Sequence, residues 1–238
     1  MTRMLFAVVV SSSFWPVALW GGEEGKEETV SYLKPSGKKF VPEARFTVRQ
    51  GKYGWSIASS TGGGEREMGV RAKYDAADRL QSAAATLTME DYKAVALVEC
   101  KDGKAAVHPK DRPVATFPVV AGMIVTSAPD WTDAFLLCRR YDRAKGGKQK
   151  FVGLWVHPKE QALLLDLTIE AEGKDVVRRN GEDVELTRCR IVLRGPQAYV
   201  AWMDKEGGLI KLVSASPKGG SALIRDGWET VWEQLRAK

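Results

Sequence analysis

The chain has 238 residues, of which 44% are hydrophobic and 28% are charged, a composition typical of a globular protein rather than of a disordered one. Its formal net charge is +6. Because the basic excess is spread thinly along the chain, whereas a nucleic-acid binder gathers Lys and Arg on one face, we expect no nucleic-acid partner.

The first 22 residues differ in character from the rest. Arg3 is followed by the apolar run 5–10, three serines and a second apolar stretch that ends at Trp20. This order is typical of a secretory signal peptide, and the serines and Pro16 interrupt it too often for a membrane span. We therefore expect residues 1–22 to be a signal peptide and the protein to be exported to the periplasm or the extracellular space. A buried N-terminal strand is the alternative.

Residues 23–44 are rich in Gly, Glu, Lys and Pro, and we interpret them as a linker or mobile arm. From Arg45 onward, large apolar residues alternate with polar ones, which is the two-residue period of a strand. We interpret residues 45–238 as a single β-rich domain. The further strands predicted in its first half are 67–75, 80–89, 91–100 and a short strand ending at His108.

One segment in the middle of the chain has helical spacing. Trp131, Phe135 and Cys138 recur at intervals of three or four residues, and basic residues follow at the end, where the helix dipole favours them. This pattern predicts a helix over residues 129–142.

The second half again predicts strands, and Asn180-Gly181 is a strong hairpin signal. An amphipathic helix is predicted from Asp226 to Leu235. The fold class is therefore mainly β (α+β): a curved antiparallel sheet or incomplete barrel with one middle helix and a C-terminal helix. A sheet this long is expected to curl or close around the middle helix.

Catalytic and metal-binding motifs are missing from the sequence. His108 and His157 each precede a proline and are typical of strand ends, and Gly62-Gly63-Gly64 lacks the Lys-Ser/Thr ending of a phosphate loop. The three cysteines, Cys100, Cys138 and Cys189, fit no metal ribbon, and whether two of them form a disulfide stays open. We expect no enzyme activity, no metal and no cofactor.

Two groups of residues are candidate contact sites. The basic cluster after the middle helix includes Arg139, Arg140 and Arg143, which would contact an anionic surface such as lipid headgroups, phosphates or an acidic partner. A solvated helix end is the alternative. Three tryptophans lie within strand-like alternation and would either line an apolar ligand site or pack in the core: Trp55, Trp155 and Trp202.

The strand order also carries a resemblance. A strand at 46–48 precedes the Gly-rich strand 51–55, and much later the long strand 186–193 leads to a hairpin with Trp202 and Asp204. Over residues 45–215 this order resembles uncharacterised exported β-rich domains of bacterial envelopes, which are similar to the lipoprotein-carrier (LolA/LolB-like) half-barrel proteins. The resemblance implies an incomplete barrel covered by helices, with the three tryptophans lining a cavity for acyl chains.

Two functions follow from these patterns. The first is a non-enzymatic envelope module that binds an apolar or lipid-like ligand in its curved sheet. The alternative is a structural or protein-interaction domain whose concave face is filled by its own helix and whose partner surface is the basic loop 139–150. The expected partners are a lipid-like small molecule or an envelope protein, with peripheral membrane contact. An enzyme whose site is assembled from scattered residues is a third hypothesis.

The export hypothesis makes a direct prediction. Protein recovered from the extracytoplasmic fraction should have an intact mass that lacks about the first 20 residues, because a signal peptide is removed on export. Intact-mass spectrometry measures this. A mature cytosolic protein that still starts at Met1 or Thr2 would contradict it.

Overall fold

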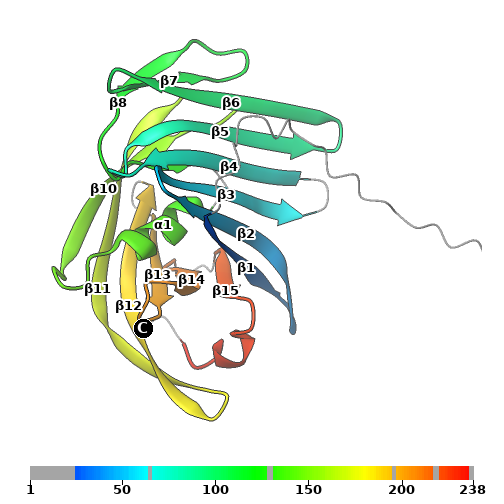
Figure 1. Cartoon of the computed structure of the whole chain (residues 1–238). Coiled ribbons are helices and arrows are strands. Elements are labelled where there is room, and N and C mark those ends of the chain that lie inside the picture. The colour runs from blue at the N-terminus through cyan, green and yellow to red at the C-terminus, as the bar shows by residue number, and fades with distance from the viewer. Residues whose placement is uncertain (1–24, 64–65, 128–130, 195–196, 217–219, 236–238) are drawn as a thin grey trace, which may run out of the picture.

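Alternating buried and exposed residues run through most of the chain, and in the computed structural model they form one 15-stranded sheet (Figure 1). The structure describes residues 25–63, 66–127, 131–194, 197–216 and 220–235. The expected signal peptide, residues 1–22, lies outside the described residues.

The strands fall into two series in which consecutive strands pair antiparallel, except for β9, which pairs in parallel with β10. The first series is β1 (Lys26–Ser36), β2 (Lys39–Gly51), β3 (Gly54–Gly63), β4 (Arg66–Asp75), β5 (Leu80–Met89), β6 (Tyr92–Lys101), β7 (Lys104–His108) and β8 (Ala115–Pro118). The second series is β9 (Ile124–Thr126), β10 (Lys148–Trp155), β11 (Leu163–Arg179), β12 (Glu182–Arg194), β13 (Gln197–Met203), β14 (Leu209–Ser214) and β15 (Ala222–Arg225). The helix α1 (Thr132–Arg140) lies between β9 and β10 in the chain.

The two series meet where β1 pairs with β15. This junction is narrow, because its antiparallel register joins only Tyr32 with Arg225 and Leu33 with Ile224. The sheet order runs from β8 through β1 and β15 to β9, and its neighbours are antiparallel except for the parallel pair β9 and β10. In this order β8 and β9 are the two end strands, so the curved sheet is an incomplete barrel.

The concave face of the sheet is filled by α1 (Figure 1). Seven of its nine residues are buried, from Thr132 to Cys138. The Phe135 ring stacks on Phe46 with centroids 4.6 Å apart and meets the edge of Tyr32 at 6.5 Å. All three rings are almost completely buried. The expectation that the sheet curls around the middle helix is therefore confirmed.

The strongest local patterns are also confirmed. The strands expected at 67–75, 80–89 and 91–100 are β4, β5 and β6, each within one or two residues of its predicted bounds. Asn180 and Gly181 form the tight turn of the hairpin between β11 and β12, with φ angles of +52° and +88°. Positive φ at both central residues is what a type I′ turn requires.

The interpretation of residues 23–44 as a linker or arm is wrong for most of that segment, because β1 and the first part of β2 lie there. Val30 and Tyr32 are buried at alternate positions of β1. In the sequence, Pro35 and Pro42 interrupt the alternation of apolar and polar residues that would indicate these strands. Each lies in a stretch with a partner strand on only one side, which is the edge position where sheets tolerate proline.

The predicted C-terminal α-helix is also corrected. Within the described part of Asp226–Leu235, the helical piece is the short 3-10 turn η2 (Glu229–Val231). Trp228, Val231 and Leu235 are buried against a second apolar cluster, separate from the one around α1. So short a segment cannot stabilise a helix by itself, and tertiary packing decides its conformation.

The burial of α1 yields a stability prediction. Phe135→Ala should lower the free energy of unfolding by about 3–5 kcal/mol, because it leaves a cavity between α1 and β2. Denaturant titration followed by tryptophan fluorescence measures this. The matched control is Val176→Ala on β11, whose side chain is 64% exposed, and it should change stability by less than about 0.5 kcal/mol. Equal small effects in both variants would contradict a core role for α1.

Candidate functional site

A cavity of about 440 Å³ lies where the chain leaves α1. It is bordered by the loop after the helix, by β11 and β12, and by the turn between β13 and β14. Its lining residues are Tyr141, Arg143, Gly146, Gly147, Ala171, Gly173, Lys174, Glu185, Thr187 and Lys205. A volume of this size is within the range that small-molecule sites occupy.

The strands form one side of the cavity. In the pairing of β11 with β12, Ala171 lies opposite Cys189 and Gly173 opposite Arg188, so Glu172 is an extra residue in a bulge. Beyond the bulge Lys174 lies opposite Thr187. Because a bulge bends its strand and re-aims the side chains that follow, it presents Lys174 at the cavity.

The loop after α1 also borders the cavity and is held by its own polar contacts. The Gln149 side chain accepts a hydrogen bond from the Asp142 backbone N–H at 3.0 Å and donates to the Asp142 carbonyl at 2.6 Å. The Tyr141 hydroxyl donates to the Gly147 carbonyl at 3.1 Å. The loop wall is thus fixed by the protein itself before any ligand arrives.

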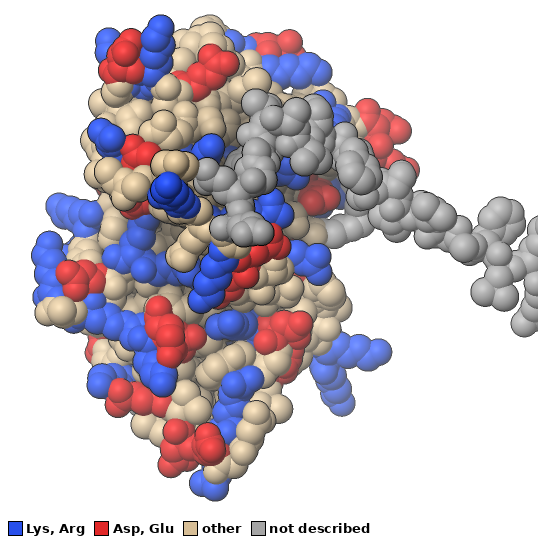
Figure 2. Space-filling model, viewed as in Figure 1, with Lys and Arg blue, Asp and Glu red and all other residues tan. Residues whose placement is uncertain are grey.

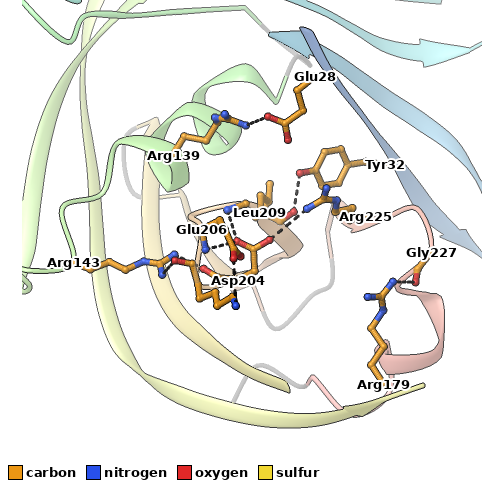
Figure 3. Close-up of polar contacts among 12 residues, drawn as sticks. Glu28, Tyr32, Arg139, Arg143, Arg179, Asp204, Glu206, Leu209, Arg225 and Gly227 are labelled. Atoms are coloured by element: carbon orange, nitrogen blue, oxygen red, sulfur yellow. Dashed lines mark hydrogen bonds and ion pairs between the residues drawn. The ribbon is translucent and has the colours of Figure 1, made fainter. Parts of the chain in front are cut away.

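Arg143 ties this loop to the neighbouring turn. Its guanidinium donates to the backbone carbonyls of Asp204 and Lys205 (Figure 3). The Asp204 carboxylate organises the same turn by accepting from the backbone N–H groups of Glu206 and Gly208, and it pairs with Arg225 on β15 at 3.4 Å. The position of Arg143 therefore depends on the turn between β13 and β14, which Arg225 on β15 helps to hold.

The cavity lining carries more positive than negative charge. Arg143, Lys174 and Lys205 are cationic, and Glu185 is the one carboxylate among the lining residues. Lys174 Nζ lies 2.7 Å from Glu185 Oε1, in a pair whose side chains are both more than half exposed. Figure 2 shows Lys and Arg side chains gathered over the flank of the molecule where Figure 1 places β10 and β11.

The three arginines predicted to contact an anionic surface have different surroundings. Arg139 pairs with Glu28 on β1 at 2.8 Å. Arg140 donates to Asp78 at 2.7 Å and to the Gly122 carbonyl at 2.9 Å, and its side chain is 12% exposed. Only Arg143 borders the cavity. The surface-contact role of the set stays a prediction, and the geometry gives Arg139 and Arg140 partners within the chain.

The three tryptophans predicted to line a ligand site are not brought together. Trp55 packs against the main core, stacks on Tyr74 at 4.2 Å and donates to Asp78 at 3.0 Å. Trp155 stacks on His157 at 6.2 Å, while its chain neighbours point into the main core. Trp202 belongs to the second cluster. Their role as ligand contacts stays a prediction.

Sequence reasoning missed the residues that the strands and the turn between β13 and β14 place at the cavity. Lys174, Thr187 and Lys205 are distant in sequence from the basic loop, and a single Lys in a strand or turn carries no local signal. The available hint was the interruption of alternation at Glu172-Gly173, which indicates a bulge, and bulges are common beside functional sites.

Two features are absent from the part of the chain that the structure describes. No group of three His, Cys, Asp or Glu side chains among those residues could hold a metal ion. Among the same residues, no helix is both long enough and apolar enough to cross a membrane.

Comparisons with known proteins add two structural likenesses. No family model and no curated protein matches the chain. A β-barrel-like protein of the domain of unknown function DUF1849 from Brucella abortus is 9% identical, covers 84% of this chain and 94% of its own, and has a TM-score of 0.49. A DUF1089 family protein from Pseudomonas aeruginosa is 13% identical, with coverages of 74% and 92% and a TM-score of 0.42.

The pairing of its own strands makes this chain a β-barrel-like protein with an open sheet. The resemblance to the lipoprotein carriers stays a prediction.

The cysteines provide a chemical test of the site's surroundings. Burial raises the pKa of Cys189 to about 12, and it raises the pKa of Cys138 well above its ordinary value, with nearby Cys189 and Asp204 adding to the shift. Burial also raises the pKa of the half-buried Cys100. All three are free thiols. Because the thiolate is the reactive form, Cys138 and Cys189 should react slowly in the folded protein.

We predict that iodoacetamide at about pH 8 alkylates Cys100 well before Cys138 and Cys189, because only Cys100 is accessible to the reagent. Peptide mass spectrometry over time measures the three rates. In denaturant the three rates should converge, which is the control. Rapid labelling of Cys138 in the native protein would show that α1 leaves the sheet easily.

Proposed function

We propose that this protein is a non-enzymatic interaction domain of the cell envelope, in which the sheet and its helix form a scaffold and the basic end of the scaffold binds an anionic partner. The observation that carries the proposal is the burial of α1 in the concave face. A carrier of acyl chains needs an open apolar space at that place, and in this chain Phe135 and its neighbours occupy it.

Charge supports the choice of partner. The chain has a net charge of +6, and three cationic side chains surround the cavity at the end of α1. A partner that presents negative charge would be attracted to this end and oriented by it. We also propose that the protein shares the half-barrel architecture of the lipoprotein carriers but not their acyl-chain cargo, because α1 occupies the concave face.

The contrast between a core helix and a lid gives the first test. If α1 is core, the backbone amides of Leu136 and Leu137 should exchange only through global unfolding, since both side chains are buried. Native-state hydrogen exchange in increasing denaturant measures this. The β-strand amides of Val70 and Ala85 on β4 and β5 are the matched control, and they should exchange with the same free energy. Exchange of α1 through a separate, lower-energy opening would support a lid instead.

The second test asks directly for a ligand. Native mass spectrometry of the full protein purified from its own cells without detergent should give the mass of the polypeptide alone. A reproducible extra mass that is released on denaturation and partitions into organic solvent would contradict this proposal. That outcome would restore the alternative, an envelope module with a lipid-like ligand in its sheet.

A further inference from the structure

We propose that the cavity at the end of α1 is a binding site for a phosphate-type oxyanion, carried either by a soluble phosphate ester or by a phospholipid headgroup. The inference rests on the proposed function, because it names the chemical group by which the proposed anionic partner is recognised. Its evidence is the donor set around the cavity and the arrangement of the charges that border it.

The lining matches the chemistry of a tetrahedral oxyanion. Such a group has several acceptor oxygens and up to two negative charges near neutral pH. Arg143, Lys174 and Lys205 supply three cations from three separate segments, and Thr187 adds a hydroxyl to the lining. Gly146, Gly147 and Gly173 also line the cavity, and their lack of side chains leaves space for a ligand close to the backbone.

Arg143 is fixed in a conformation suited to binding. Both of its terminal nitrogens donate, one to the carbonyl of Asp204 and one to that of Lys205, and these contacts hold the guanidinium plane in place. A guanidinium has five N–H donors, so these contacts leave others for a ligand. A preoriented cation loses little conformational entropy when the ligand binds, and this favours affinity.

Lys174 is held differently, in a contact that an anion can replace. Its ammonium group pairs with Glu185 across the two strands, and both side chains are well exposed. An exposed pair of this kind contributes little to stability. An incoming oxyanion would therefore displace the Glu185 carboxylate from Lys174 at small cost. Before that happens, Glu185 competes with the ligand for the same cation.

The volume of the cavity suits a small ligand. About 440 Å³ accommodates a phosphate group with a glycerol or a sugar attached. The cavity thus fits a small phosphate ester, or a headgroup that enters from a membrane surface while the acyl chains stay outside.

The hairpin of β11 and β12 offers a matched control pair. Arg178 and Asp183 face each other on the same two strands, nearer to the turn, with side chains that are 70% and 69% exposed. Neither borders the cavity. Replacing Arg178 changes the net charge by the same amount as replacing Lys174, and Asp183 corresponds in the same way to Glu185.

The experiment is a calorimetric titration of the full-length protein with inorganic phosphate and with glycerol 3-phosphate, at ionic strength held constant with chloride. We expect a single site with a dissociation constant of about 1 mM or tighter. Lys174→Gln should weaken binding about tenfold, as expected for the loss of one charge-assisted contact. Glu185→Gln should strengthen binding by several-fold, because the competing carboxylate is removed.

The controls decide whether the cavity or the overall charge is responsible. Arg178→Gln and Asp183→Asn should each leave the dissociation constant within about twofold of the parent value, because screening weakens charges that lie outside the site. If Arg178→Gln weakens binding as much as Lys174→Gln does, or if no binding occurs, the inference is overturned. Circular dichroism of each variant confirms that it is folded.

Vesicles distinguish the two sources of the phosphate group. Binding to phosphatidylglycerol vesicles that falls in Lys174→Gln but not in Arg178→Gln assigns the ligand to a headgroup. Binding to glycerol 3-phosphate alone assigns it to a soluble ester. If the protein binds neither the vesicles nor glycerol 3-phosphate while the α1 amides stay protected from exchange, the oxyanion site is overturned and the interaction-domain proposal stands. An apolar ligand that co-purifies with the protein would overturn the interaction-domain proposal, and it would leave the phosphate titration unchanged.

Discussion

The packing of α1 against the concave face is the contact on which the rest of this molecule depends. The sheet is built from two series of strands, and the strands that join them, β1 and β15, share only two residue pairs. So short a ladder cannot by itself fix the two series relative to each other. The helix does so, because Phe135 packs on β2 of the first series while α1 also contacts β9, β11, β12 and β14 of the second.

Charged residues at the end of α1 strengthen this connection. Arg139 reaches Glu28 on β1 (Figure 3), and Arg140 reaches Asp78 in the turn between β4 and β5. The Arg140 guanidinium also lies 5.2 Å from the Trp55 ring and 5.0 Å from the Tyr74 ring, at distances where cation–π attraction operates. Partly buried arginines paired in this way hold the end of the helix in place. The loop that follows therefore begins at a fixed position.

The fixed end of α1 connects the core to the cavity. Because α1 is fixed, the loop after it begins at a fixed place, and Arg143 meets the turn of Asp204 and Lys205. The second apolar cluster supports the same region from the other side of the sheet. There Trp202 donates to Asp175 at 2.8 Å, and Lys211 donates to the Trp232 carbonyl at 2.7 Å. A buried lysine is tolerated because carbonyls and the Trp232 ring replace its water.

The sequence by itself determined the local structure. Alternation predicted β4 to β6 almost to the residue, Asn180-Gly181 predicted its hairpin, and helical spacing predicted α1. It failed for β1, where prolines interrupt the alternation, and for the C-terminal segment, where Lys211 and the second cluster decide the conformation.

The cavity was decided by tertiary structure alone. Lys174, Thr187 and Lys205 have no shared local pattern, and they reach Arg143 only through strand register, a bulge and the fixed end of α1. Local sequence encodes periodicity and turns because these depend on neighbouring residues. Which distant side chains converge depends on how the whole sheet curves around its helix.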